Sequence, residues 1–351
     1  MLTCAVLLFR YGAHLSKEQV SELVAPHPDT LELVTSWLEY NGVPTSSIST
    51  THGGEWLTVI EVPVSQADNI LGASYQLYYH AETNDIILRT VSYTLPAVLH
   101  THVQTVVPTT AFTSSFLLQQ TPRSRPGGDA AAQTWNATTE EPVNRLSRRE
   151  PSVTPSVLRS MYKMEGFYPT ERELNSLGVV GFENQDPRIR DLSNFMHEYR
   201  SDARILILEV KPINNLVGTG LPGMHSSLGA QYASALTYPN PVIYYRGIGA
   251  RVEVPQRLRG RGDRYLEWLN YMTRQEEVPQ TISMAYGSTS ELSISPEYAL
   301  SVCRLFGQLG SRGVSVLVAS GDDGVGRGQC RNVFGSIQFY AGFPASCAYS
   351  I

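Results

Sequence analysis

The chain contains the segment Val314-Ser315-Val316-Leu317-Val318-Ala319-Ser320-Gly321-Asp322-Asp323-Gly324-Val325-Gly326, and this segment decides the fold prediction. Its first half is an apolar run rich in β-branched residues, typical of a strand buried on both faces of a parallel sheet. The glycines and carboxylates that follow would lie just beyond the strand's carboxyl end, where open α/β sheets bind ligands. An ordinary Asp/Gly turn explains the same spacing, so the pattern alone leaves both interpretations open.

The residues before this segment predict a helix and an earlier strand. Ser295 is a suitable N-cap, Pro296 suits the first helical position, and Gly310 suits a left-handed C-terminal cap. Apolar residues at 299, 302, 303, 306 and 309 form one stripe of this helix. Residues 281–287 predict a short strand, and the order strand, helix, strand predicts a right-handed βαβ unit.

Three short sequences in this region carry a family resemblance: PQTISMAYG at 279–287, SVCRLFGQLGSRGVSVL running into SGDDGVG at 301–326, and FPASC at 343–347. Together they resemble the sedolisin, or serine-carboxyl peptidase, family in its secreted fungal tripeptidyl-peptidase branch. The resemblance implies an α/β fold with a subtilisin-like, doubly wound, mostly parallel sheet, incomplete in this chain. It also implies a preceding α+β activation pro-domain that packs against the catalytic domain.

Composition excludes several classes of function. The 351 residues are enough for two domains, and the net charge of −5 comes with no basic stripe that would predict nucleic-acid binding. No apolar run is long enough to predict a membrane span. Residues 1–9 are apolar, but they lack a basic n-region and a small-residue cleavage site, so they predict a strand better than a signal peptide. Secretion is therefore implied by the resemblance alone.

The pattern along the chain predicts three parts. Residues 1–104 predict the activation pro-domain, in which Ser16 and Gln19 form a capping box, and YGAHLSKEQV at 11–20 carries the resemblance. We expect this domain to be incomplete at its N-terminus. Residues 105–152 predict a flexible linker, because Pro, Gly, Thr and charged residues occur there without periodicity. Residues 153–351 predict the peptidase domain, which we expect to be truncated at its C-terminus.

The linker contains two candidate modification sites. Asn136 begins an Asn-Ala-Thr glycosylation acceptor, and Arg148-Arg149 is a dibasic pair suited to removal of a pro-segment. The residues alone are equally consistent with an ordinary charged loop, and the resemblance to a pro-peptidase favours processing. Elsewhere, the adhesion-type tripeptide at 261–263 is best explained by chance in an Arg/Gly-rich loop.

The four cysteines are Cys4, Cys303, Cys330 and Cys347. Cys330 and Cys347 flank the loop after the Gly-rich turn and are the candidate disulfide in an oxidising compartment. Cys303 lies on the apolar stripe of the predicted helix, which predicts a buried free thiol. No Cys/His spacing predicts a zinc site.

The resemblance implies a particular form of serine-peptidase chemistry. A Glu takes the proton of the nucleophilic serine, an Asp four residues later on the same helix face orients that Glu, and a protonated Asp stabilises the oxyanion. In this sequence the Glu position is occupied by His225, the orienting Asp position by Gly229, and the oxyanion position by Asp322. Only one of these three carboxylates is therefore present.

The remaining parts of the family site are expected beyond Ile351, namely the serine of a Gly-Thr-Ser sequence and a calcium site. Ser320 precedes Asp322 but belongs to the turn, and we do not assign it as the nucleophile. His225 has the chemistry of a base, yet Gly229 cannot orient its ring, so a solvated or core histidine is the other interpretation. No further cofactor is implied.

Two hypotheses follow for the function. The first is a tripeptidyl-peptidase zymogen that releases tripeptides from peptide N-termini at acidic pH, but that is truncated or wrongly spliced and inactive as written. The second is a non-catalytic pseudo-peptidase that binds peptides, or that binds an active relative through its pro-domain.

Overall fold

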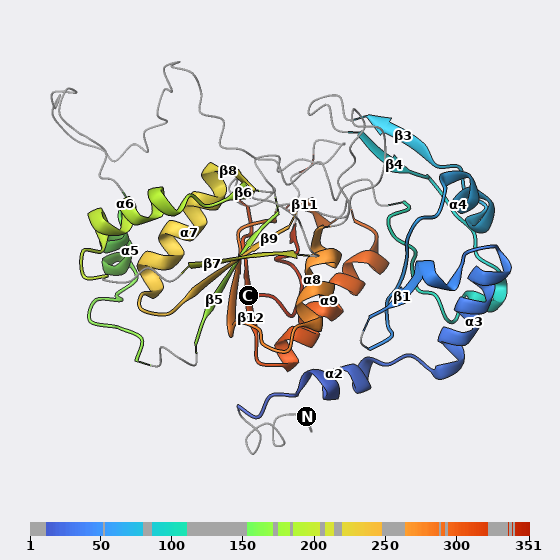
Figure 1. The fold of residues 1–351 in the computed structure, drawn as a ribbon, viewed down its shortest axis with the longest axis horizontal. Coiled ribbons are helices and arrows are strands. Elements are labelled where there is room, and N and C mark those ends of the chain that lie inside the picture. Colours follow the sequence, from blue (N-terminus) through green and yellow to red (C-terminus); the bar gives the residue numbers. More distant parts are fainter. Residues whose placement is uncertain are drawn as a thin grey trace.

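The computed structural model describes residues 12–51, 53–79, 86–110, 153–170, 175–182, 185–203, 208–213, 220–247, 264–287, 289–291, 294–321, 336, 339 and 341–351. We call the described residues of 12–110 the N-terminal lobe and those of 153–351 the C-terminal lobe. Figure 1 shows the N-terminal lobe, blue to teal, curving along the side of the C-terminal lobe that carries α8 and α9.

The N-terminal lobe is built from short helices and two separate hairpins. β1 pairs with β2, and β3 pairs with β4, both antiparallel. Its elements are α2 (Lys17–Val24), α3 (Pro28–Tyr40), η1 (Thr45–Ser47), β1 (Ile48–Thr50), β2 (Leu57–Val59), α4 (Val64–Leu71), β3 (Gln76–Tyr79), β4 (Ile86–Arg89) and η2 (Ala97–Leu99).

The C-terminal lobe alternates strands and helices, the order that a doubly wound sheet requires. Its elements are α5 (Pro155–Met161), β5 (Leu177–Gly181), β6 (Gln185–Asp186), α6 (Ile189–Tyr199), β7 (Leu208–Pro212), β8 (Leu221–Pro222), α7 (Met224–Thr237), β9 (Val242–Arg246), α8 (Arg264–Arg274), β10 (Thr281–Met284), β11 (Thr289–Ser290), α9 (Pro296–Ser311), β12 (Ser315–Val318) and β13 (Gly342–Phe343).

The central sheet has five strands in the order β12-β10-β5-β9-β7, and all of its pairs are parallel. The predicted βαβ unit is confirmed, because β10 and β12 lie side by side with Thr281 opposite Ser315. Ile351 continues the sheet beyond β12, since its N–H donates to Val316 O and its carbonyl accepts from Val318 N. The α/β fold class predicted from the sequence is thereby confirmed.

The helix boundaries follow local sequence signals, with two differences from the prediction. Ser16 and Gln19 form the predicted capping box, and the Ser295 side chain accepts from Tyr298 N at the start of α9. α9 continues past Gly310 to Ser311, and the left-handed position is Gly313, with φ +84°. The chain turns back only where β12 must begin, so strand pairing and not the first glycine sets the end of the helix.

Pairing of the cysteines also differs from the prediction. Cys303 on α9 is bonded to Cys347, with 5.6 Å between their Cα atoms. The predicted free thiol at Cys303 and the predicted bond between Cys330 and Cys347 are therefore corrected, and Cys330 itself lies outside the described residues. Cys303 is on the face of α9 toward residues 342–350, a proximity that sequence separation gave no means to find.

The largest buried cluster lies between the sheet and the helices α8 and α9. It includes Trp268, Leu269, Val302, Leu309 and Val316, each at most 1% exposed. β12 and β10 supply one side of this cluster, and α8 and α9 close the other side, as Figure 1 shows. The apolar stripe predicted on 295–310 is thus the face of α9 that packs on the sheet.

The two leucines at opposite faces of α9 give a matched test of this packing. Leu309 is 0% exposed and Leu300 is 51% exposed. We expect Leu309→Ala to lower the free energy of unfolding by about 3 kcal/mol, because it leaves a cavity in the core. Leu300→Ala should change it by about 0.5 kcal/mol or less. Urea unfolding measures both, and equal effects would show that α9 is not seated as described.

Candidate active site and lobe interface

The candidate active site lies at the carboxyl ends of β5 and β10, next to the N-terminus of α7. The ring of His225 on α7 packs at a tilt of 43° against Tyr286, which follows β10, with 4.8 Å between the ring centroids. Phe182, which follows β5, contacts the same tyrosine with 4.9 Å between the ring centroids. Chain order reverses between β5 and β10, and the strand ends at such a reversal are where doubly wound sheets usually bind ligands.

His225 has no hydrogen-bonding partner for its buried Nε2 atom among the residues described here. A general base needs a second group that fixes the ring and its tautomer, as the carboxylate does in a catalytic triad. The described contact is instead an aromatic face, which orients the ring but accepts no proton. The assignment of residue 225 to the base position remains a prediction.

Gly229 lies one turn further along α7 and faces the sheet. A Cβ atom added there would meet Val179 Cγ1 of β5 at 3.4 Å, an ordinary contact distance. The position therefore has space for the start of a side chain on the same face as His225. α7 contains no Asp or Glu at any position, so no carboxylate of this helix replaces the missing pair.

The start of α7 is fixed by a buried ion pair. Asp186 Oδ2 accepts from Arg246 Nη1 at 3.0 Å and from Gly220 N at 2.5 Å, and the two charged side chains are 19% and 4% exposed. Asp186 is in β6, which pairs with β8 immediately before α7. Gln185 lies so close to Gly223, the N-cap of α7, that any Cβ there would clash with it. This chain of contacts places His225 relative to the sheet.

The end of β10 approaches the turn after β12 closely. A Cβ atom at Gly287 would lie 2.6 Å from Ala319 O, so only glycine fits at this position. Gly321 has φ +96°, which other residues adopt only with strain. Ser320 lies just after β12. The predicted Asp/Gly turn itself lies mostly outside the described residues and remains a prediction.

Several predicted site residues lie outside the described residues. They are Asp322, Asn136, Arg148, Arg149 and the tripeptide 261–263. The assignments of an oxyanion residue, a glycosylation acceptor and a processing site at these positions remain predictions.

A second functional region is the interface between the lobes. Both carboxylate oxygens of Glu55 accept from Gln308 Nε2 on α9, at 2.8 and 2.7 Å. One helical turn away, Arg304 Nη1 donates to Gln104 Oε1 at 2.6 Å. Burial at this interface raises the pKa of Glu55, and the hydrogen bond from Gln308 and the nearby Arg304 charge only partly offset it.

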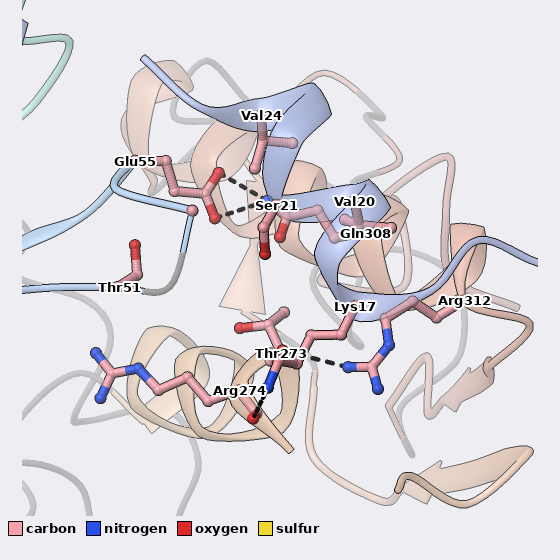
Figure 2. Close-up of a pocket in the computed structure, with 11 residues that line it drawn as sticks. Lys17, Val20, Ser21, Val24, Thr51, Glu55, Thr273, Arg274, Gln308 and Arg312 are labelled. Atoms are coloured by element: carbon pink, nitrogen blue, oxygen red, sulfur yellow. Dashed lines mark hydrogen bonds between the residues drawn. The ribbon is translucent and has the colours of Figure 1, made fainter. Parts of the chain in front are cut away.

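The same interface continues to the end of α8. Lys17 on α2 forms an ion pair with Glu276 and also donates to Arg274 O at 3.4 Å. Arg312, at the end of α9, donates to the backbone carbonyls of Thr273, Gln275 and Glu276. Figure 2 shows Lys17, Glu55 and Arg312 around a cavity of about 10 Å³, a volume for one water molecule and not for a peptide.

The sequence alone does not predict this interface, although the spacing of three polar residues on α9 indicates a polar face there. Arg304, Gln308 and Arg312 recur every four residues and therefore share one face of α9. That spacing predicts a polar face, and an exposed polar face is the ordinary expectation for a helix that covers a sheet. Only the folded structure shows that residues 17, 55 and 104 cover it.

Two classes of site find no support within the described residues. No three His, Cys, Asp or Glu side chains gather there in a way that would hold a metal ion. In the same part of the chain, no helix combines the length and apolar character needed to cross a bilayer.

Known proteins with similar sequences indicate the family to which this chain is related. Residues 9–112 match the Pro-kumamolisin activation domain. The chain is 31% identical over 350 residues to the probable tripeptidyl-peptidase SED3 of Trichophyton verrucosum, and 30% identical over 351 residues to the tripeptidyl-peptidase SED3 of Arthroderma otae. The resemblance to the sedolisin family is confirmed. Each alignment covers 97% of this chain and 56% of the relative, so the chain spans about half the length of these sedolisin-type relatives.

A solved structure is also similar. Pseudomonas sedolisin, a serine-carboxyl proteinase complexed with two molecules of pseudo-iodotyrostatin, is 16% identical with a TM-score of 0.43. The match covers 56% of the chain described here and 52% of the sedolisin chain.

Glu55 makes the stability of the chain depend on pH. Its pKa is raised above 4.5 in the folded state, so the folded state binds a proton more tightly than the unfolded state. This contribution is present below the unfolded pKa and is lost as the pH rises through the folded pKa. We expect the urea midpoint of Glu55→Gln, relative to wild type, to increase from pH 4 to pH 7 (approximate values bracketing ordinary carboxyl titration).

A suitable control for this pH effect is Glu39→Gln, because Glu39 is an exposed acid of the same lobe whose side chain accepts from Thr45 Oγ1. A pH-independent difference between wild type and Glu55→Gln would contradict the burial of Glu55.

The buried ion pair next to α7 gives a separate prediction. We expect Asp186→Asn to lower the free energy of unfolding by about 3 kcal/mol, because it removes the charge that faces an Arg246 side chain only 4% exposed. Glu209→Gln is the control, since Glu209 and Lys211 are 57% and 39% exposed in their pair, which should contribute about 1 kcal/mol or less. Thermal or urea unfolding distinguishes the two, and equal losses would remove the special role of Asp186.

Proposed function

We propose that this chain is a secreted zymogen of the sedolisin type, related to tripeptidyl-peptidases, whose carboxylate base has been lost. The N-terminal lobe is the activation pro-domain, and the C-terminal lobe is the peptidase scaffold. Peptide N-termini are the ligand class that the relationship implies, at acidic pH. The crevice between β5 and β10 is the place where they would bind, and the chain would not hydrolyse them.

One observation carries this proposal: His225 and Gly229 occupy the face of α7 on which the family carries two carboxylates. Without a base, the serine hydroxyl of such an enzyme keeps its proton and attacks a carbonyl poorly. His225 contacts Tyr286 in place of an acid. Removing a general base lowers the rate by about 10²–10⁴-fold in typical enzymes.

The cysteines also favour secretion. A bond such as that between Cys303 and Cys347 is typical of proteins in an oxidising compartment. The sequence also contains an N-glycosylation acceptor at Asn136 and a dibasic pair at Arg148-Arg149. Glycosylation and cleavage at such sequences take place in the secretory pathway. Together with the relationship to fungal tripeptidyl-peptidases, these features favour an extracellular protein.

Calcium has no assigned place in this proposal. Among the described residues, no three His, Cys, Asp or Glu side chains gather in a way that would hold the calcium ion which the family implies. No step in binding or hydrolysis is therefore derived through a metal.

Peptide release by the full-length product of the transcript tests the proposal. We expect wild type to release no tripeptide above background at acidic pH, and His225→Glu with Gly229→Asp to gain release when the chain also carries the Gly-Thr-Ser serine that the family uses as nucleophile. Space at residue 229 for the added Cβ supports this restoration. Tripeptide is measured by mass spectrometry after incubation with an oligopeptide.

The matched control is Ser227→Glu with Gln231→Asp, which places the same two acids four residues apart on a different face of α7. This control should stay inactive. Tripeptide release by wild type would contradict the loss of the base.

The second candidate function is a non-catalytic binding protein. The same missing carboxylates favour it, because a scaffold without a base still presents the crevice between β5 and β10. Equilibrium dialysis with an intact oligopeptide separates it from an inert scaffold. Retention of the peptide without cleavage supports binding, and no retention at millimolar peptide contradicts it.

A further inference from the structure

Six aromatic residues form a continuous run of ring contacts from the candidate active site to α9. We call this run the aromatic chain, and in order it consists of His225, Tyr286, Phe182, Tyr265, Phe343 and Tyr298. Neighbouring ring centroids lie between 4.8 and 6.2 Å apart, which is the range of favourable aromatic pairs. Every member except His225 is at most 3% exposed. The rings therefore pack as one block inside the largest buried cluster.

Tyr265 on α8 is the link in the middle of the aromatic chain. Its ring centroid lies 5.7 Å from that of Phe182 and 6.0 Å from that of Phe343, and both contacts are edge to face. It thereby joins the rings at the ends of β5 and β10 to the rings next to α9. Because buried side chains are close-packed, a movement of Phe343 is transmitted through Tyr265 toward Tyr286.

Phe343 belongs to residues 341–351, which we call the strap. Near the start of the strap, β13 pairs with β11, and Phe343 lies opposite Thr289. At its end, Ile351 N donates to Val316 O at 2.9 Å, and Ile351 O accepts from Val318 N at 2.8 Å. The strap is thus attached to strands at both of its ends.

The middle of the strap is attached to α9 by the bond between Cys303 and Cys347, which we call the strap disulfide. Cys347 follows Phe343 by four residues in the strap, and Cys303 follows Tyr298 by five residues in α9. The bond therefore keeps the two elements that carry the last rings of the aromatic chain side by side. Cys347 is 5% exposed, whereas Cys303 is only partly buried, so a thiolate can approach the bond from α9.

We propose that the strap and its disulfide position the aromatic wall of the candidate active site, with Phe343 and Tyr265 as positioning residues. Reduction of the strap disulfide by a dithiol loosens the strap and, through the aromatic chain, the Tyr286 ring against which His225 packs. In that step the S–S bond takes two electrons and two protons from the dithiol and becomes two thiols, while the dithiol closes to a disulfide. Peptide binding at the site then depends on the redox state of the strap, a consequence that rests on the proposed function.

Nuclear magnetic resonance of the His225 ring and hydrogen exchange of the strap test the proposal in the full chain. Cys4 and Cys330 are replaced by serine, so that the strap disulfide is the only one that the chain can form. The His225 resonance is identified by its loss in His225→Gln. We expect reduction by dithiothreitol to speed exchange of the Ile351 and Cys347 amides and to shift the His225 resonance. Faster strap exchange with an unshifted His225 resonance would overturn the proposal.

A matched pair of substitutions at residue 265 tests the link. Tyr265→Leu removes the ring in the middle of the aromatic chain, so we expect reduction to speed strap exchange as before but to leave the His225 resonance unshifted. Tyr265→Phe keeps the ring and should keep the shift. Tyr271→Leu should also keep it, because Tyr271 packs against the same cluster while its ring contacts Tyr245, outside the aromatic chain. A shift that persists in Tyr265→Leu would contradict transmission through these rings.

Hydrogen exchange in β9 distinguishes a local support from a support of the whole lobe. β9 lies between β5 and β7 in the sheet, away from the strap. We expect its amides to stay protected when the strap disulfide is reduced. Loss of protection throughout β9 would rule out the positioning role, because the disulfide would then stabilise the whole lobe and not the site in particular.

Peptide retention in equilibrium dialysis separates this proposal from the proposed function. We expect reduction to weaken retention of the intact oligopeptide by about fivefold, the size of effect typical of coupling through packed side chains. Equal retention by oxidised and reduced chains would contradict the redox dependence of binding. If the oxidised chain retains no peptide, the proposed ligand class is contradicted, whereas a shift of the His225 resonance on reduction still supports the positioning role.

Discussion

The parallel pairing of β10 with β12 is the constraint on which the rest of the C-terminal lobe depends. Two parallel neighbours cannot be joined by a tight turn, so the chain must cross the sheet, and α9 is that crossing. The crossing buries one side of α9 against the sheet in the largest apolar cluster. Its other side is left facing away from the sheet, and that is where the N-terminal lobe lies.

Because α9 is the crossover between the parallel strands β10 and β12, it has two roles. Leu309 and Val302 hold it to the sheet, while Arg304 and Gln308 meet the N-terminal lobe. Trp56 joins the two roles, because it reaches from the tip of a hairpin into the cluster beneath. The fold of the C-terminal lobe and the contact between the lobes consequently share part of one core, which explains how a lobe of two-stranded hairpins is kept in place.

The candidate active site lies at the carboxyl ends of β5 and β10. α7 is set by Gly223 and by the Asp186–Arg246 pair, and its first turn brings His225 to these strand ends. α7 itself contains no Asp or Glu. Tyr286, which contacts His225, belongs to the same buried cluster against which Trp56 packs, so the site and the lobe interface share one core.

Local sequence patterns were enough to predict the fold class and the βαβ unit. Both depend on short-range signals, namely a buried apolar run and a capped helix with an apolar stripe. The assignments of residues 225, 229 and 322 to the family's site remain predictions. Only the folded structure shows that Cys347 is bonded to Cys303, that α9 ends at Ser311, and that Glu55 of the N-terminal lobe covers Gln308. Each of these joins residues far apart in the chain, where local spacing contains no information about distance.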